Sequence, residues 1–266
     1  MNEHKETVQT GRAKSEGSFS LPKLLSVSPS PHMRCLDTTR SVMLDVIIAL
    51  IPAAIWGIYS FGWRAAVIIL ISVAVSVLTE AVYEVATRKS VTCADLSAAV
   101  TGLILGLSMP PAVPVWVPAV GAVFAIVIAK QLFGGIGKNI VNPALAARVF
   151  LMLCWPDQMT KYIDVKTDLV SSATPLTVLK TGVSPADTVF RCVVGNISGS
   201  IGEVSAIALF AGFIYLLVRR VVSWQLPVGF VGTVALWSVL FPNTGDNVSC
   251  MLYNIFCGGL LMCALI

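Results

Sequence analysis

Long apolar runs separated by short polar intervals dominate the chain after residue 40. A helix needs about 20 apolar residues to cross the hydrocarbon core of a bilayer. Reading for such runs predicts eight segments, at 43–62, 65–86, 96–110, 115–132, 143–155, 202–218, 225–241 and 250–266. The third and fifth are short, so we expect half-helices or buried helices there. The pattern therefore predicts an all-α polytopic membrane protein.

The composition agrees with this prediction. Of the 266 residues, 56% are hydrophobic and only 12% are charged, whereas soluble domains carry about 25% charged residues. The net charge of +4 comes largely from the N-terminal tail and the loops, where basic residues set orientation in a membrane. No nucleic-acid-binding motif is present, so the lipid bilayer and not a nucleic acid is the expected partner.

Basic residues predict the orientation of the segments. The first 40 residues are polar and lack the apolar core of a signal peptide, so we expect a cytoplasmic N-terminal tail at 1–40. The same side then receives the basic residues of the loops, which are Arg88, Lys89, Lys130, Lys138, Arg148, Arg219 and Arg220. The long interval 156–201 falls on the extracytoplasmic side.

An internal repeat is predicted from the spacing of the segments. The spans that begin near 43 and 65 recur about 160 residues later, and "TGLILGLSM" (101–109) resembles "CGGLLMCAL" (257–265). An odd number of segments in each copy makes the second copy enter the membrane from the other side, which gives an inverted five-plus-five repeat. We expect the first repeat at 41–155 and the second at 202–266, with the last two segments of the second repeat absent.

Three stretches break the apolar pattern inside or beside these segments. Pro110, Pro111 and Pro114 in "GLSMPPAVP" interrupt a helix, and predict either a surface loop or a discontinuous helix that lines a cavity, with the repeat favouring the second. Among ionisable residues, Asp45 fits either an ion or proton pathway or a membrane-surface position. Glu80 and Glu84 share a helix face with Arg88, which predicts an interfacial salt bridge.

The glycine-rich stretch "QLFGGIGKNIVNPALAARVF" (131–150) could hold an anion. Backbone amides ahead of a helix that begins at Pro143, together with a lysine, can bind a phosphate or the edge of a flavin ring. The stretch lacks a complete Walker pattern and does not follow a strand, so a tight cytoplasmic turn with a helix cap is the alternative. The candidate residues are Gly134, Gly135, Gly137, Lys138 and Asn139.

The longest polar interval contains a cluster of Ser and Thr, in "DLVSSATPLTVLKTG" (168–182). The two histidines, His4 and His32, lie in the cytoplasmic tail, so no base on the same side could activate a hydroxyl. We therefore predict no catalytic residue here. A hydroxyl that another enzyme modifies, or turn chemistry around Pro175, remains. The seven cysteines form no CxxC pair and predict buried thiols, with a metal or iron–sulfur ligand shared with a partner as the alternative.

Three motifs in order resemble one family. "SPHMRCLDTTRSVMLDVIIALIPA" (30–53), "FGGIGKNIVNPALAARV" (133–149) and "SSATPLT" (171–177) are similar to the NqrB/RnfD family of membrane subunits. In that family the Thr of an S-x-A-T type motif carries FMN through a phosphoester that a dedicated flavin transferase makes from FAD. The resemblance implies covalent FMN on Thr174, transferase recognition at Ser172 and Ala173, and motif neighbours at Pro175 and Thr177. Ser172 stands where glycine is often found.

The resemblance also implies a role and partners. Rnf complexes pass electrons between ferredoxin and NAD and couple the flow to Na⁺ or H⁺ translocation across a prokaryotic cell (inner) membrane. We expect the chain to relay electrons through its FMN near the extracytoplasmic face, with other Rnf subunits as partners, a urea-transporter-like fold and no resident metal. A second, noncovalent flavin near the glycine-rich turn stays open. The alternative is a cofactor-free channel or secondary transporter built on inverted repeats.

Overall fold

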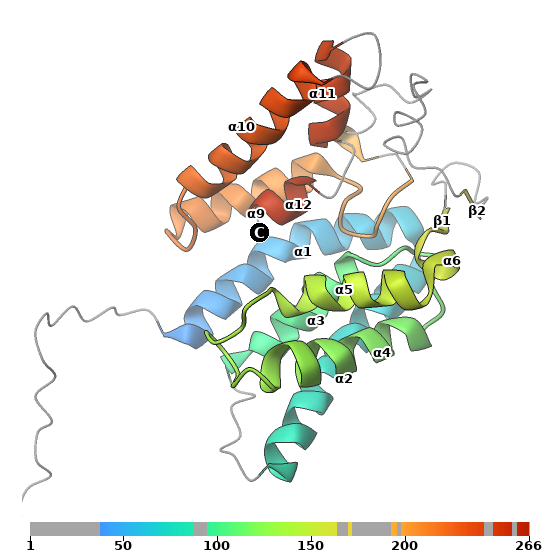
Figure 1. Cartoon of the computed structure of the whole chain (residues 1–266), viewed down its shortest axis with the longest axis vertical. Helices are drawn as coiled ribbons and strands as arrows, with labels where there is room; N and C mark the ends of the chain where they lie inside the picture. Colours follow the sequence, from blue (N-terminus) through green and yellow to red (C-terminus); the bar gives the residue numbers. More distant parts are fainter. Residues whose placement is uncertain are drawn as a thin grey trace, which may run out of the picture. The chain divides into compact units, whose positions relative to one another are not determined.

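The computed structural model describes residues 38–87, 95–163, 170–171, 193–195, 198–241, 247–256 and 260–265. Within these ranges the chain is helical apart from one pair of two-residue strands (Figure 1). The elements of the first half are α1 (Thr39–Phe61), α2 (Trp63–Ala86), α3 (Ser97–Leu107), α4 (Trp116–Phe124), its π-helical continuation η2 (Ala125–Gln131) and α5 (Pro143–Cys154). They are followed by α6 (Pro156–Met159), β1 (Tyr162–Ile163), β2 (Val170–Ser171), α9 (Ala206–Val218), α10 (Gln225–Leu240), α11 (Asn247–Phe256) and α12 (Leu260–Leu265).

The helices follow the predicted apolar runs closely, with one exception. α3 has 11 residues and α5 has 12, which at about 1.5 Å per residue is shorter than the roughly 30 Å of a bilayer core. The expectation of short helices at these two places is therefore confirmed. The exception is the predicted span at 250–266, which is wrong because this stretch contains two separate helices, α11 and α12.

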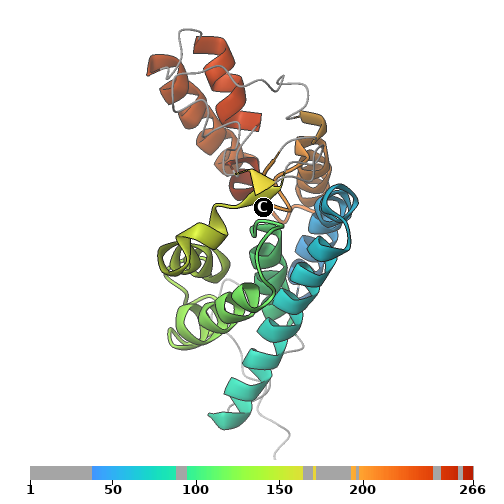
Figure 2. The same ribbon diagram turned by 90° about the vertical axis from the view of Figure 1, so that its right-hand side faces the viewer.

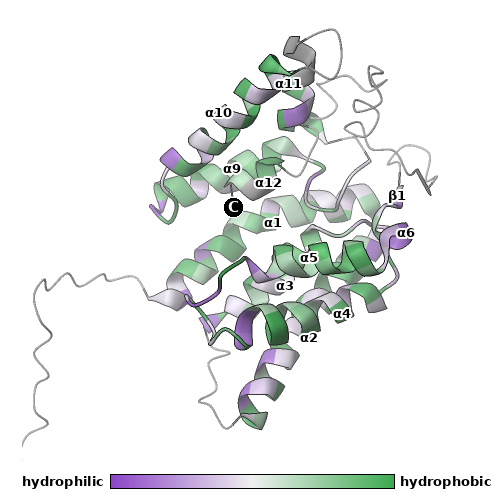
Figure 3. Ribbon diagram, viewed as in Figure 1, coloured by the Kyte–Doolittle hydropathy of each residue, from purple (hydrophilic) through white to green (hydrophobic). Residues whose placement is uncertain are grey.

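Apolar side chains cover the outside of the helices as well as the core. α1 and α2 are each long and apolar enough to cross a membrane. The outer face of α2 carries Leu70, Leu78 and Val82, which are 67%, 63% and 67% exposed. Most of the helical ribbon in Figure 3 is accordingly green, the colour of hydrophobic residues. Soluble monomers rarely expose so much contiguous apolar area, so the chain is a membrane protein.

Glycines allow the central helices to approach closely. A side chain at Gly102 would meet the backbone of Val73 at 2.7 Å, and one at Gly106 would meet the backbone of Ile69 at 3.0 Å. Both pairs join α3 to α2. Gly212 makes the same kind of approach, with α9 lying against α1 at Ala49. Small residues at helix contacts are typical of membrane proteins, where close backbone packing replaces the hydrophobic effect between helices.

The proline-rich break after α3 is buried in protein. Leu107 and Met109 are fully buried, and their carbonyls accept hydrogen bonds from the amides of Gly202 at 2.7 Å and Ile201 at 3.1 Å. The segment 198–205 ahead of α9 therefore supplies the donors that the broken helix needs inside a membrane. The surface-loop alternative is therefore wrong, because protein groups satisfy the carbonyls where the helix breaks off; that the break lines a cavity stays a prediction.

The second half of the chain packs on the first through α9. α9 contacts α1 on one side and α12 on the other, and α10 packs against α11 and α12. The view in Figure 2 shows α9 beside α1, with α10 and α11 further out. Among the described helices, α1 and α9 therefore form the main contact between the two halves.

Candidate functional site

The residues predicted to carry FMN lie outside the described residues. These are Ser172, Ala173, Thr174, Pro175 and Thr177. The nearest described element is β2, which ends at Ser171, three residues ahead of Thr174. β2 pairs antiparallel with β1, so that Tyr162 lies opposite Ser171. The strand pair therefore fixes the backbone at Ser171, the first residue of the stretch 171–177 that is predicted to carry FMN.

The glycine-rich stretch forms a compact turn between η2 and α5. Gly134, Gly135 and Gly137 all have positive φ, at 103°, 90° and 80°, which glycine adopts without strain. With its amide oriented to satisfy both groups, Asn139 donates to the carbonyls of Lys130 at 3.2 Å and Gly135 at 3.1 Å. The turn is thereby folded back onto the end of η2.

A cavity of about 410 Å³ lies beside this turn. Gly137 and Asn139 line it, together with the buried ends of Ser97 and Lys130, whereas Lys138 is exposed and does not. The remaining lining residues are Met43, Val100, Thr101, Ile104, Ile136, Ile140, Val141, Asn142 and Pro143. The cavity thus combines apolar walls with a few hydroxyl, amide and ammonium groups, as small-molecule sites do.

One lining residue of the cavity, Lys130, belongs to a buried ion pair. The Lys130 ammonium donates to Glu80 Oε1 and, at 2.6 Å, to Ser97 Oγ. Gln131 Nε2 donates to the same Glu80 oxygen at 3.2 Å. Lys130 and Gln131 are adjacent in sequence, and η2 is a π-helix, a form that often marks functional places. The side chains of Lys130 and Glu80 are each only 2% exposed.

This pair corrects the prediction for Glu80. The sequence predicts an interfacial salt bridge to Arg88, but Glu80 is buried and pairs with Lys130 from another helix. Arg88 itself lies outside the described residues, so the predicted partner of Glu84 is not tested. The second oxygen of Glu80, Oε2, and the hydroxyl of Ser76 have no hydrogen-bond partner among the described atoms. Both atoms lie on α2, one turn apart.

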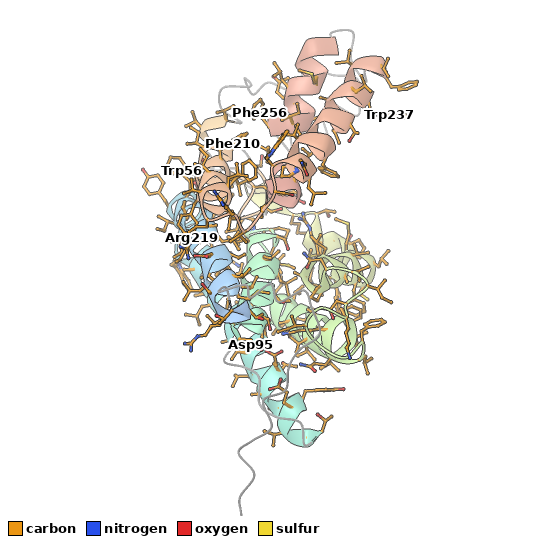
Figure 4. All side chains as sticks on the ribbon, turned by 90° about the vertical axis from the view of Figure 1, so that its left-hand side faces the viewer. Trp56, Asp95, Phe210, Arg219, Trp237 and Phe256 are labelled. Atoms are coloured by element: carbon orange, nitrogen blue, oxygen red, sulfur yellow. The ribbon has the colours of Figure 1, made fainter. Side chains whose placement is uncertain are left out.

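Asp45 joins α1 to α9. Its carboxylate accepts a hydrogen bond from the Tyr215 hydroxyl at 2.9 Å and pairs with the Arg219 guanidinium at 3.1 Å. Figure 4 shows Arg219 beside α1 at the end of α9. Asp45 is 5% exposed whereas the Arg219 side chain is 49% exposed. The geometry places Asp45 in an interhelical ion pair whose cation is half exposed.

A second charged cluster links α5 to the turn before α9. Arg148 Nη1 donates to Glu203 Oε1 at 3.0 Å, and Nη2 donates to Ser200 Oγ at 3.2 Å. Tyr162 of β1 lies against this pair. Burial is the largest influence on the Tyr162 phenol and raises its pKa. The charge of Arg148 and its hydrogen bond lower this pKa, whereas the charge of the Glu203 carboxylate raises it further.

The contacts of two cations, Lys130 and Arg148, are not predicted by the sequence. The charge pattern alone assigns both residues to cytoplasmic loops. A signal for Lys130 is present, since a lysine inside the apolar run "AIVIAKQL" needs a counter-charge. The identity of that counter-charge cannot be inferred from the sequence, because Glu80 lies 50 positions earlier. Among the described residues, no three His, Cys, Asp or Glu side chains come together as metal ligands.

Comparison with known proteins decides the family. A model of the NQR2, RnfD, RnfE family matches residues 26–266. The chain belongs to this family. It is 45% identical over 221 residues to the D-type subunit of the Na⁺-translocating ferredoxin:NAD⁺ oxidoreductase complex of Acetobacterium woodii, with 81% of this chain and 69% of the relative covered. It is 37% identical over 256 residues to the D-type subunit of the proton-translocating ferredoxin:NAD⁺ oxidoreductase complex of Clostridium ljungdahlii, covering 90% and 76%.

A third relative has a broader name. The D-type subunit of an ion-translocating oxidoreductase complex from Rhodobacter capsulatus is 32% identical over 275 residues, with 88% of this chain and 75% of the relative covered. The first two relatives are named for different coupling ions. Family membership and the names of these relatives therefore do not decide between Na⁺ and H⁺.

Proposed function

We propose that the chain is the D-type membrane subunit of an ion-translocating oxidoreductase complex and relays electrons through FMN held on Thr174 by a phosphoester. Membership of the NQR2, RnfD, RnfE family is the observation that carries this proposal. The names of the relatives support a ferredoxin:NAD⁺ oxidoreductase as the complex. The other subunits of that complex and a flavin transferase are the proposed partners.

The chain's own residues would hold and place the cofactor. A bound flavin supplies the electron transfer, while the protein supplies attachment, orientation and electrostatics. Tyr162 and Ser171 lie opposite each other in the strand pair that precedes the attachment motif. In the sequence, Thr174 follows the small Ala173, which would leave room for a modifying enzyme, and precedes Pro175, whose ring restricts the backbone.

Covalent flavin can be tested directly. The chain is coexpressed with a flavin transferase, purified, denatured and run on a gel that is viewed by flavin fluorescence. We expect a fluorescent band for the wild type and for Thr177→Val, and none for Thr174→Val. A wild-type band without fluorescence, in a preparation where the transferase labels a known substrate, would overturn the proposal.

We further propose the inverted repeat, which the packing of the described helices supports. α12 packs against α9 and α10, as α3 packs against α1 and α2. The first helix of each half begins after a hydroxyl N-cap, Thr38 for α1 and Ser205 for α9. The domain division follows, with a tail at 1–40, repeats at 41–155 and 202–266, and the flavin loop at 156–201.

We infer the orientation from the two ends of the helices. Exposed basic residues, Arg40, Lys138 and Arg220, lie where α1 and α5 begin and α9 ends. Aromatic side chains gather at the opposite ends, where the exposed Trp63 and Trp116 lie. Basic residues favour the cytoplasm and aromatic residues favour the interfaces. This supports a cytoplasmic N-terminus and an extracytoplasmic flavin loop in a prokaryotic cell membrane.

A second, noncovalent flavin is proposed for the cavity beside the glycine-rich turn. Its volume of about 410 Å³ falls in the range of small-molecule sites, about 300–1,000 Å³. Val100 and Ile104 offer an apolar wall for a flat ring, and Asn139 and Lys130 offer polar groups at its edge. Flavin extracted from Thr174→Val protein by acid, and lost when Val100→Trp is added, would support this site.

The alternative function is a channel or secondary transporter without a cofactor. The inverted repeat and the buried Glu80–Lys130 pair would suit such a protein. Covalent flavin on Thr174 separates the two functions, because a channel has no need of the attachment.

A further inference from the structure

A row of buried polar side chains on α2 faces α3. Ser72, Ser76 and Glu80 follow one another at intervals of four residues, so they lie on one face of the helix. Both serines are fully buried, and Glu80 is 2% exposed. Ser72 donates to the carbonyl of Gly102 on α3 at 2.8 Å, and a side chain at Gly102 would meet Ser76 Oγ at 2.8 Å. The row therefore lies inside the contact between α2 and α3.

Two oxygens of this row have no hydrogen-bond partner among the described atoms. They are Ser76 Oγ and Glu80 Oε2, on neighbouring turns of α2. The other carboxylate oxygen, Glu80 Oε1, accepts hydrogen bonds from both Lys130 and Gln131. Buried polar groups are nearly always hydrogen-bonded, and an ionisable residue inside a membrane domain often marks the path of an ion. The two unpartnered oxygens therefore point to a small polar or charged ligand.

The Lys130 ammonium already lies where a cation would bind. It donates to Glu80 Oε1 and, at 2.6 Å, to Ser97 Oγ, so that a carboxylate and a hydroxyl oxygen contact one positive charge. Together with Glu80 Oε2 and Ser76 Oγ, this part of the chain offers four side-chain oxygens. Carboxylate and hydroxyl oxygens are the ligands that hard metal cations prefer.

The local charges favour a monovalent cation. α3 and α4, which also pack against α2, have no ionisable side chain. Asp45 of α1 pairs with Arg219, and Glu84, buried one turn beyond Glu80, has an interaction of its own. The Glu80 carboxylate is thus balanced by one ammonium. A monovalent cation can replace that ammonium without leaving an excess charge at the carboxylate, whereas a divalent cation would leave one buried and unpaired.

The cavity beside the glycine-rich turn gives the displaced ammonium a place to go. Lys130 lines this cavity of about 410 Å³, together with the amide side chains of Asn139 and Asn142. Amide oxygens accept hydrogen bonds from an ammonium, and lysine carries its charge on a flexible four-carbon chain. The Lys130 side chain can therefore turn from the carboxylate into the cavity.

We propose that Glu80 is a binding site for an alkali-metal cation, which replaces the Lys130 ammonium at the carboxylate while the ammonium moves into the cavity. Ser76 and Ser97 supply hydroxyl ligands, and Lys130 is a tethered competitor of the cation. The inference rests on the proposed function, because it names an ion site in a subunit of an ion-translocating complex. No flavin takes part in it.

The test is the thermal unfolding of the purified full-length chain in a nonionic detergent, with NaCl, KCl or choline chloride at equal ionic strength. A ligand that binds only the folded chain raises the melting temperature, and choline is too large for a buried site. We expect Lys130→Met to melt about 5 °C or more higher in an alkali-metal salt than in choline chloride. The wild type should need more of the same salt, because its ammonium competes.

Matched variants separate binding from general effects of salt. The double variant Glu80→Gln with Lys130→Met has no carboxylate at the site, so the difference between salts should disappear. Ser76→Ala, added to Lys130→Met, should raise the salt concentration needed for the shift, because one oxygen ligand is lost. Ser72→Ala in the same background should not, since the Ser72 hydroxyl already donates to Gly102.

Three results would overturn the inference: equal melting temperatures of Lys130→Met in all salts, a difference between salts that survives in the double variant, or recovery of stability by lower pH and by no alkali-metal salt. The last result would show that Glu80 takes a proton. If Lys130→Met does not fold, Lys130→Gln replaces it, because its amide can still donate to the carboxylate. Failure of both variants to fold in every salt also contradicts the inference. Absence of covalent flavin on Thr174 is measured separately and would overturn the proposed function alone.

Discussion

Replacing Lys130 with methionine leaves the Glu80 carboxylate buried without its cation. Lys130→Met keeps most of the side-chain volume and removes two hydrogen bonds, to Glu80 Oε1 and Ser97 Oγ. Gln131 would remain as a donor to Glu80. Removing one partner of a buried ion pair costs about 3–5 kcal/mol. Because both side chains are 2% exposed, water cannot solvate the remaining carboxylate, and we expect a loss of stability within this range.

A double-mutant cycle separates the pair from simple loss of packing. Glu80→Gln with Lys130→Met replaces both charges, so the double variant should recover at least about 2 kcal/mol of the loss seen in Lys130→Met. Unfolding is measured in detergent by titration with SDS, and followed by far-UV circular dichroism. Lys161→Met is the control, because Lys161 is exposed and such changes stay within about 0.5 kcal/mol.

Two results would refute this reasoning. Lys130→Met as stable as the wild type would mean that the ion pair carries no energy in the membrane domain. A double variant no more stable than Lys130→Met would mean that the loss comes from the cavity wall and not from an orphaned carboxylate.

Single contacts elsewhere in the chain give three more predictions. Gly212→Ala should cost about 1–3 kcal/mol by forcing α9 off Ala49, whereas Gly232→Ala on α10, which meets nothing within 4 Å, should be neutral or slightly stabilising in the same SDS titration. Asn142→Ala should cost about 1 kcal/mol, because the Asn142 side chain caps α5. The Tyr162 phenol should titrate above its ordinary pKa of about 10, since burial raises its pKa. Its contribution to stability is then present below about pH 10 and is lost as the pH rises through the raised pKa. The titration is followed by tyrosinate absorbance, and the part of that signal that is missing from Tyr162→Phe belongs to Tyr162.

The helices were predictable from the sequence because apolar runs need no knowledge of what lies around them. α2 was predicted at 65–86 and observed at Trp63–Ala86, and α4 with η2 was predicted at 115–132 and observed at 116–131. Pro143 gave one helix start correctly, since α5 begins at that residue. The division of 250–266 into α11 and α12 was not predicted, since only Asn254, Gly258 and Gly259 interrupt an otherwise apolar run.

The partners of the charged residues were not predictable, and the reason is physical. Local rules pair charges three or four residues apart on one helix, which suggested Arg88 for Glu84 and, because Glu80 shares that helix face, a common salt bridge for both carboxylates. Burial changes the choice, because a carboxylate inside a membrane domain pairs with whichever cation the packing of the helices brings to it. That cation, Lys130, lies 50 positions away, and a single sequence holds no information on such a contact.

The ion pairs of Lys130, Arg148 and Arg219 act where apolar packing alone would leave helices free to slide. Contacts made by glycine and alanine are close but similar along a helix, so they fix the spacing of two helices better than their register. A buried charge needs an opposite charge beside it, and a buried charge without its partner lowers stability by several kcal/mol. Lys130–Glu80 joins elements within the first half of the chain, whereas Arg148–Glu203 and Arg219–Asp45 each join the first half to the second. The first pair therefore shapes the cavity by the glycine-rich turn, and the other two place α9 and its preceding turn against the first half.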